Sequence, residues 1–395
     1  MSEWRSARIG LLEATDPAAA RLVDRLLTVA QRTLRRSYLG AEFAFTLRGD
    51  ELAAEGTSIR YGAIASLGLA QLPDQAQRAI LVGQDSDDLI GRLAMGLDRM
   101  TDRGDVALIG LAAAEAGHSE LPHAIDRLAE LDRRLTSGEP GDAIDVVAAA
   151  WVVTALVAAR AALDVEPHLA AARQRLLDAR RVAFAHQIGG AQKWYRAHVG
   201  SFADQIYPVQ ALARLHASAD DPVALAAAEQ VARVICRAQG PAGQWWWHYD
   251  ARSGAVVEGY PVYSVHQYAM APMGLLDLAE AGGEDHLAEI RRGLRWMAGR
   301  PETTEPLIAV EKPVIWRKVG RNDPRKLVRG LAAARSAVLP GTSMPGVGLL
   351  FPPRTVDYEC RPYELGWMLY AWLSGGRAGE GGQRENLSAR REGAA

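Results

Sequence analysis

Cysteine is almost absent from this chain of 395 residues, which contains only Cys236 and Cys360. Two cysteines cannot build a disulfide framework, and these two lack the paired spacing of a zinc site. The H-E-x-x-H, EF-hand, P-loop, dinucleotide-binding and G-x-S-x-G motifs are absent too. We therefore expect a protein of a reducing compartment that has no metal site and no cofactor.

Excess charge and long hydrophobic runs are also missing. The formal net charge is −2, from 45 basic and 47 acidic residues, so no nucleic-acid partner is expected. The apolar run at 143–159 contains Asp145 and is too short for a membrane span. The N-terminal residues MSEWRSARIG lack the apolar core of a signal peptide. These features predict a cytoplasmic protein without a membrane span.

Helical patterns dominate, and strand patterns are weak. Six Ala/Leu-rich segments open with small and polar residues, which is typical of inner helices: 58–72, 104–117, 141–160, 202–217, 265–282 and 358–374. Before each comes a helical segment that is charged on one face: 17–37, 85–100, 119–136, 166–188, 221–238 and 284–299. Six such pairs predict an all-α fold, a closed (α/α)6 barrel or toroid of six helical hairpins. We expect one domain over residues 1–375 and a disordered tail at 376–395.

The connections between these helices differ in length. Links from an outer to an inner helix include four long ones, at 38–57, 189–201, 239–264 and 300–357, whereas most inner-to-outer links are short. In an antiparallel ring, all outer-to-inner links lie at the end where the inner helices begin. Long loops in a compact domain are usually functional, and helix N-termini add partial positive charge. The sequence therefore predicts a site at this end.

The long loops are rich in aromatic and charged side chains. Flat aromatic faces beside hydrogen-bonding groups suit sugar rings, so the expected partner is a small-molecule or oligosaccharide substrate. The residues expected to bind it are Arg60, Trp194, Arg196, Trp246, His248, Tyr263, Gln267 and Arg361. We further expect Trp246, His248, Tyr260, His266 and Arg60 to surround one cavity at the inner-helix N-terminal end.

A resemblance adds to this interpretation. The alternating helices, together with Gln239-Gly-Pro-Ala-Gly243-Gln-Trp245, resemble the α/α toroid superfamilies. These include six-hairpin glycosidases, related polysaccharide lyases and sugar epimerases, and the terpenoid cyclases with protein prenyltransferases. The motif is similar to the QW repeat of the cyclases, but similar Gly-x-Trp loops occur in the sugar enzymes. The resemblance covers about 16–375 and concerns architecture only.

Two kinds of sugar chemistry fit the residues near the inner-helix starts. A glycoside hydrolase needs one protonated and one ionised carboxyl across the scissile bond, for which Asp204, Glu359 and Glu364 are candidates. A lyase or epimerase needs a base and cations beside a carboxylate or carbonyl. His266 and Tyr260 are candidates for the acid–base groups. The cations expected there are Arg60, Arg196, Arg317, Arg321 and Arg361. Hydrolysis, elimination and epimerisation therefore stay open.

One motif suggests another class of enzyme. Asp85-Ser86-Asp87-Asp88 has the D-x-D-D form of the proton donor in class II terpene cyclases. It opens an outer helix at the short-loop end, where aspartates serve as caps, and five phenylalanines are few for a carbocation cavity. Our leading expectation is a carbohydrate-active enzyme. An isoprenoid cyclase and a non-catalytic glycan-binding barrel are the alternatives.

Overall fold

The computed structural model describes residues 6–136, 143–190, 193–299, 301–309, 311–324, 327–342 and 346–374, so the predicted tail at 376–395 lies outside the described residues. All six predicted inner segments are helical. They are α3 (Ile59–Leu69), α6 (Arg103–Ala116), α8 (Val146–Ala159), α10 (Ala203–Ala219), α12 (Ala271–Glu280) with the π-helical turn η2 (His266–Met270) before it, and α16 (Pro362–Leu373).

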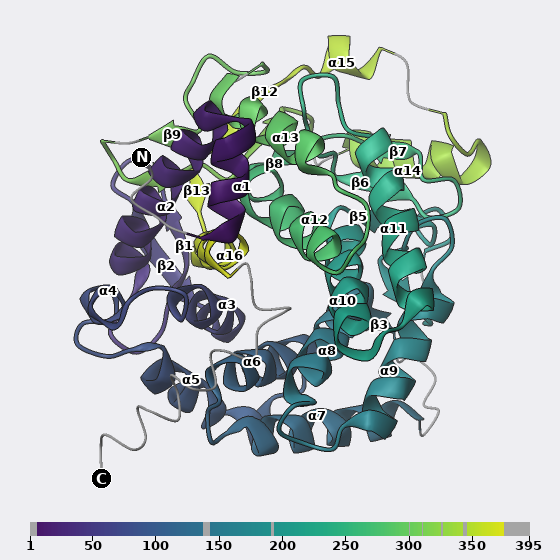
Figure 1. Cartoon of the computed structure of the whole chain (residues 1–395). Coiled ribbons are helices and arrows are strands. Elements are labelled where there is room, and N and C mark those ends of the chain that lie inside the picture. The colour runs from purple at the N-terminus through teal and green to yellow at the C-terminus, as the bar shows by residue number, and fades with distance from the viewer. Residues whose placement is uncertain are drawn as a thin grey trace.

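These helices form a closed inner ring. Each one packs against the next along the chain, and α16 packs against α3 to close the circle (Figure 1). The outer ring consists of α2 (Pro17–Ser37), α5 (Ser86–Ala94), α7 (Leu121–Thr136), α9 (Glu166–Ala179), α11 (Pro222–Arg237) and α13 (Leu287–Gly299). The predicted (α/α)6 barrel is thereby confirmed.

Side-chain size and polarity explain which helices lie inside. The sequence of α8, VVAAAWVVTALVAA, is apolar on nearly every face and almost entirely buried, whereas α2 buries one apolar stripe and exposes its arginines. The first and last inner helices meet at two glycines. A Cβ on Gly68 would overlap the carbonyl oxygen of Gly366, and one on Gly366 would lie 2.6 Å from the Ile64 oxygen. Glycine is therefore required for this close approach of the two backbones.

The fifth inner helix contains an irregularity that Pro272 explains. Proline lacks the N–H that would bond to the carbonyl four residues earlier, so the helix opens with the π-helical turn η2. The freed carbonyl oxygen of Tyr268 accepts a hydrogen bond from Trp372 Nε1 (2.7 Å) instead. The indole of the last inner helix thus completes the backbone bonding of the fifth.

The loops contain short strands that the sequence analysis did not predict. Three sheets have three strands each: β13 (Glu359–Cys360), β1 (Ala44–Arg48) and β2 (Ala53–Thr57); β5 (Val199–Ser201), β6 (His248–Asp250) and β7 (Val256–Glu258); β12 (Pro353–Asp357), β11 (Lys318–Arg321) and β8 (Val262–Tyr263). Two pairs complete the set: β3 (Ile144–Asp145) with β4 (Gln187–Ile188), and β10 (Val314–Ile315) with β9 (Ile308–Ala309). Strands of two to five residues are too short to show an alternating pattern. They join the long loops to one another at the mouth of the barrel.

Further helices lie outside the two rings. They are α1 (Ala7–Thr15), α4 (Asp74–Ile80), the 3-10 turn η1 (Leu97–Arg99), α14 (Leu327–Val338) and α15 (Val347–Leu350). The N-terminal helix α1 packs on the C-terminal end of α16, where Ser6 Oγ donates to the Trp372 oxygen (2.5 Å) and Arg8 to the Ala371 oxygen (2.7 Å). In the described part of the chain, no helix combines the length and hydropathy that a membrane crossing requires.

Candidate active site

A cavity of about 280 Å³ opens where the inner helices begin. We call it the mouth cavity. Its charged lining consists of Arg60, Arg317 and Arg361, joined by His266; its aromatic lining consists of Tyr61, Tyr207, Tyr263, Tyr363, Trp151 and Trp247. Among the described residues no carboxylate lines it. The cavity therefore combines flat aromatic faces with cations, at the end of the barrel that the loop lengths predicted.

Two of the arginines share one carboxylate. Glu359 Oε2 lies 3.2 Å from Arg317 Nη1 and 3.1 Å from Arg361 Nη2, and its Oε1 lies 2.6 Å from Arg48 Nη2 at the rim. Burial alone would raise the pKa of Glu359, but Arg361 and Arg317 outweigh it and lower that pKa. Arg361 also donates to the Tyr61 hydroxyl (3.0 Å). Three guanidinium groups thus converge on a single ionised acid.

Glu364 is the second acid near these arginines. Its side chain is fully buried, one oxygen lies 3.4 Å from Arg317 Nε, and neither oxygen accepts a hydrogen bond from any described residue. Burial raises its pKa to about 7, although Arg317 and Arg361 act in the opposite direction. Glu364 therefore exchanges its proton near neutral pH, so the net charge beside the cavity depends on that proton.

The third arginine of the mouth cavity is fully paired. Arg60 Nε lies 2.5 Å from Asp105 and its Nη2 lies 2.9 Å from Asp102, which caps α6. The guanidinium lies over the ring of Trp151, 5.4 Å from its centre. Arg60 accordingly adds shape and hydrogen-bonding capacity to the cavity wall but little uncompensated charge.

His266 lies on the first turn of η2 and lines the mouth cavity, as Arg60 does. Its ring centre is 4.5 Å from that of Phe202 and 5.1 Å from that of Tyr263, and Nδ1 has no hydrogen-bond partner in the described chain. Burial lowers its pKa to about 3. The imidazole is therefore neutral at physiological pH and available as a hydrogen-bonding group rather than as a cationic clamp. Its predicted catalytic role stays a prediction.

Asp204 lies behind the cavity wall and is fully buried. Ser201 donates its backbone N–H (2.6 Å) and its hydroxyl (2.7 Å) to Oδ2 of Asp204, and His186 Nδ1 lies 3.2 Å from the same carboxylate. The hydrogen bond to Asp204 raises the pKa of His186 to about 9. Since Ser201 lines the cavity and Asp204 does not, the contacts of Asp204 suit a positioning role. Its predicted catalytic role stays untested.

Several predicted site residues lie outside the mouth cavity. Trp246 packs edge-on against Tyr260 (5.6 Å between ring centres), and His248 is buried against Trp247 (4.0 Å). Tyr260 lines a separate pocket beside the cavity, and the amide oxygen of buried Gln267 accepts from the Trp245 N–H (3.2 Å). The expectation of one cavity surrounded by Trp246, His248, Tyr260, His266 and Arg60 therefore needs correction: Arg60 and His266 line it, whereas the other three do not.

Trp194 and Arg196 also lie away from this lining. Trp194 is 70% exposed, and Arg196 is half-buried. The loop tryptophan that reaches the mouth cavity is Trp247.

Besides Trp247, four aromatic residues of the lining were missed by the sequence analysis. They are Tyr61, Trp151, Tyr207 and Tyr363, which lie on the first or second turns of inner helices. Large aromatic residues near the starts of otherwise Ala/Leu-rich helices were the available signal. Aromatic residues at helical spacing also pack in the core, so this pattern alone does not distinguish residues that line a cavity from residues that fill the core.

The D-x-D-D motif forms a helix cap on the outer ring. The Asp85 side chain accepts from the Asp88 N–H (3.2 Å), and Asp88 accepts from the Asp85 N–H (3.1 Å), which together form a capping box at the start of α5. Asp85 also pairs with Arg78 (2.6 Å), and Asp87 is exposed. The motif therefore has the capping role that the sequence analysis favoured.

We expect Asp87→Asn to change the free energy of unfolding by less than about 0.5 kcal/mol, because Asp87 is a surface residue outside the capping box. Asp85→Ala should cost about 1 kcal/mol through loss of the cap. Urea unfolding measures both effects, and turnover of sugar and prenyl substrates should not change in either variant. A loss of turnover in Asp87→Asn with normal stability would instead support cyclase chemistry.

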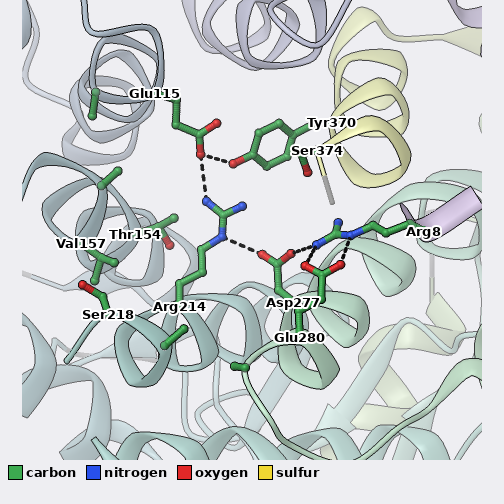
Figure 2. Close-up of a pocket in the computed structure, with 14 residues that line it drawn as sticks. Arg8, Glu115, Thr154, Val157, Arg214, Ser218, Asp277, Glu280, Tyr370 and Ser374 are labelled. Carbon is green, nitrogen blue, oxygen red and sulfur yellow. Dashed lines mark hydrogen bonds and ion pairs between the residues drawn. The ribbon is translucent and has the colours of Figure 1, made fainter. Parts of the chain in front are cut away.

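A second hollow, of about 480 Å³, lies at the other end of the barrel (Figure 2). Here Asp277 accepts from Arg8, from Arg214 Nε (2.6 Å) and from Gln210 (3.0 Å). Arg214 also reaches Glu115 (3.0 Å), which accepts from the Tyr370 hydroxyl, and Arg8 reaches Glu280 (2.6 Å). We call this set the floor network. Each charged group of the floor network has an oppositely charged partner, so we assign the network a structural role.

Sequence comparison identifies no relative, because no known family profile and no characterised protein matches the chain. Solved structures do match. An unsaturated glucuronyl hydrolase specific for heparin is 11% identical over 91% of this chain and 96% of that chain, with a TM-score of 0.57. The unsaturated glucuronyl hydrolase of Bacillus sp. GL1, responsible for the degradation of glycosaminoglycan, is 14% identical over 91% and 97%, with a TM-score of 0.58. That of Streptococcus agalactiae is 12% identical over 91% and 91%, with a TM-score of 0.55. The chain thus has the α/α toroid fold of six-hairpin glycosidase-like enzymes.

Proposed function

We propose that the protein is a carbohydrate-active enzyme that binds a uronic-acid residue of an oligosaccharide in the mouth cavity. The observation that carries this proposal is that Arg317 and Arg361 line an aromatic cavity while sharing one carboxylate, that of Glu359, which lies outside the lining. When Glu364 holds its proton, these two guanidinium groups share the single ionised carboxylate of Glu359, and a sugar carboxylate in the cavity would balance the remaining charge.

The lining also bears on the type of reaction. Hydrolysis by two carboxylates requires both acids to reach the sugar, and the described lining contains none. Proton transfer beside a neutralised carboxylate requires one acid–base group instead, and Tyr263 and His266 lie at the cavity surface. The similar structures are those of unsaturated glucuronyl hydrolases, which favours an unsaturated uronyl residue as the substrate and its hydrolysis as the reaction. The double bond of such a residue can take up a proton from one acid–base group and then add water, so this hydrolysis needs no pair of carboxylates.

The proposal assigns different tasks to the residues. Arg317 and Arg361 hold the sugar carboxylate, while the aromatic rings of Trp247, Tyr263 and Tyr363 contact the faces of the sugar. Tyr263 carries the guanidinium of Arg317 over its ring, 5.1 Å from the centre, so binding of a carboxylate to Arg317 also positions a sugar near the Tyr263 hydroxyl. Ser201, held by Asp204, supplies a further hydrogen-bonding group at the wall.

Ultraviolet absorbance distinguishes the three reactions. An unsaturated uronyl disaccharide absorbs through its conjugated double bond, so hydrolysis at that residue lowers the absorbance. Elimination from a saturated uronic-acid polysaccharide raises it, and epimerisation in D₂O incorporates deuterium without an absorbance change. We expect the first result. Binding without any turnover would identify a glycan-binding barrel, and turnover of prenyl diphosphates alone would overturn the proposal.

We expect the affinity for the acidic sugar to depend on pH through Glu364. The ordinary pKa of this carboxyl is 4.5, and its pKa in the folded protein is about 7. Between pH 4.5 and pH 7 the folded protein therefore keeps this proton, and the side chain ionises as the pH rises through 7. The ionised group then competes with the sugar carboxylate for Arg317. Calorimetric titration should show binding weakening about tenfold per pH unit above about 7 in the wild type.

The matched variant is Glu364→Gln, which removes the titrating group and keeps the shape. Its binding should be independent of pH between 6 and 9. At pH 8 the free energy of unfolding of this variant should equal or exceed that of the wild type. The reason is that the folded wild type must keep an ionised, fully buried carboxylate at this pH. An unchanged pH profile in this variant would show that another group controls binding.

A further inference from the structure

The hollow at the floor end of the barrel, of about 480 Å³, is large enough for a small organic ligand. We call it the floor hollow. Its lining comes from the C-terminal halves and caps of α6, α8, α10, α12 and α16 and from Arg8 of α1. Helix C-termini carry partial negative charge, and their last carbonyl oxygens lack partners within the helix. The position of the floor hollow therefore favours a ligand that carries positive charge and N–H donors.

The charged side chains of this lining contain one more acid than base. They are the two arginines and three carboxylates of the floor network: Arg8, Arg214, Asp277, Glu280 and Glu115 (Figure 2). Arg8 binds both oxygens of Glu280, at 2.6 Å each, and both arginines pair with Asp277. One negative charge thus stays uncompensated within the described lining, and it adds to the charge of the helix C-termini.

Glu115 provides the free acceptor of the floor hollow. Its Oε1 accepts from Arg214 Nη1 (3.0 Å) and from the Tyr370 hydroxyl, whereas its Oε2 accepts from none of the described residues. The side chain is only 17% exposed and is held in place through Oε1. A carboxylate fixed in this way binds an N–H donor of a ligand without first losing side-chain freedom.

The rest of the wall is mostly aliphatic. It is formed by Ala114, Val157, Ala158, Ala217 and Ala281. Tyr370 is the one aromatic residue in the described lining, and the guanidinium of Arg214 lies over its ring, 5.3 Å from the centre. The floor hollow therefore offers no open aromatic face to a sugar ring, but it suits an aliphatic chain with a cationic head.

We propose that the floor hollow is a binding site for an aliphatic amine or guanidine, whose cationic head contacts Oε2 of Glu115 and whose chain lies against the aliphatic wall. The inference does not depend on the proposed function, because the floor hollow and the mouth cavity lie at opposite ends of the inner helices. The floor network keeps its structural role and fixes the acids around the ligand. A ligand held by the folded barrel alone also stabilises it.

Calorimetric titration with four ligands that share a four-carbon chain tests this inference. Putrescine has an ammonium group at each end, agmatine has one ammonium and one guanidinium group, butanediol is neutral, and succinate is a dianion. We expect the wild type to bind the better of the two cations at least about tenfold more tightly than butanediol, and succinate least. The better cation should also raise the melting temperature. Equal binding of all four, or tightest binding of succinate, would overturn the site.

Glu115→Gln removes the uncompensated charge and keeps the shape, so its affinity for the cation should fall about tenfold. Glu120→Gln is the matched control, because Glu120 lies in the loop after α6 and pairs with His123 (3.0 Å) outside the lining. It should bind the cation as the wild type does. An affinity that survives in Glu115→Gln would place the amine elsewhere on the protein.

Ala217→Leu tests the same site without changing a charge. Ala217 lies on an exposed position of α10 and lines the floor hollow, so leucine there reduces the space for the ligand and leaves the core unchanged. We expect weaker binding of the cation at an unchanged melting temperature of the free protein. Unchanged affinity in this variant would contradict binding inside the floor hollow, even if Glu115→Gln proved too unstable to titrate.

The chain itself contains a second source of such a cation. In the sequence, Arg377 follows Ser374, a lining residue, by three positions. Arg377→Gln distinguishes the two sources by titration with putrescine. If Arg377 competes for Glu115, the affinity for putrescine rises in this variant; if a free amine is the natural ligand, the affinity does not change. Either result supports a cation site and identifies what fills it.

Discussion

Arg317→Gln should lower kcat/KM for an acidic disaccharide about a thousandfold. Arg317 is the arginine that contacts both acids of the site, with Glu359 at 3.2 Å and Glu364 at 3.4 Å, and it also lies over Tyr263. Removing one member of a buried, hydrogen-bonded charge pair typically costs 2 to 5 kcal/mol, and a thousandfold change corresponds to about 4 kcal/mol. Steady-state kinetics on the unsaturated disaccharide measures the loss.

Two further variants make this result specific. Arg48→Gln removes another guanidinium bound to Glu359, but Arg48 is half exposed at the rim and pairs with Glu55 as well. We expect less than a tenfold effect from it. Arg317→Lys keeps the positive charge but cannot form a bidentate contact with a carboxylate, so it should retain part of the kcat/KM that Arg317→Gln loses. Equal losses in Arg48→Gln and Arg317→Gln, with unchanged melting temperatures, would contradict a sugar carboxylate on Arg317.

The architecture was predictable from the sequence because each inner helix is a strong local signal. The stretch 146–159 within segment 141–160 is apolar on nearly every face, so it is stable only in the interior, and the structure places α8 there. The alternation of such segments with amphipathic ones determines the ring, and loop length then separates its two ends. The short strands were not predictable in this way, because their pairing depends on loops that are distant in sequence. Glu359–Cys360, for example, pairs with β1 more than 300 residues earlier.

The site was only partly predictable, for two physical reasons. First, side chains in an irregular loop do not alternate regularly, so the sequence does not show which of Trp245, Trp246 and Trp247 faces the cavity. In the structure, Trp247 faces it. Second, the sequence shows where a carboxylate stands in the chain but not which groups donate hydrogen bonds to it. Asp204 and Glu364 both lie at inner-helix starts, yet Asp204 accepts three hydrogen bonds while Glu364 accepts none from the described residues. Only the fold reveals that difference.

The two ends of the barrel differ in their electrostatics. At the mouth, inner-helix N-termini and arginines create excess positive charge, which suits a ligand. At the other end, helix C-termini carry partial negative charge, and the two arginines Arg8 and Arg214 lie among three carboxylates, those of Asp277, Glu280 and Glu115, so that no excess positive charge remains (Figure 2). The floor network joins α1, α6, α10, α12 and α16, so its loss should affect stability rather than catalysis.

Asp277→Ala should accordingly lower the free energy of unfolding by about 3 to 5 kcal/mol, because it leaves the buried guanidinium of Arg8 and the partly buried one of Arg214 without their common partner. Burial alone would raise the pKa of Asp277, but Arg214 and Arg8 outweigh it and lower that pKa to about 2. Its stabilising contribution is therefore present above the ordinary value of 3.8 and is lost as the pH falls through 2. Urea unfolding at pH 7 measures the effect of the substitution.

Glu280→Gln is the matched control at the same end. Glu280 pairs with Arg8 as Asp277 does, but its side chain is 32% exposed, so water replaces much of the lost interaction. We expect a cost of at most about 1 kcal/mol. Both variants should keep their kcat at temperatures where they are folded, since the mouth cavity is built from the opposite ends of the inner helices. A similar small cost in both variants would mean that Arg8 and Arg214 find other partners, and a loss of kcat in folded Asp277→Ala would mean that the floor network reaches the active site.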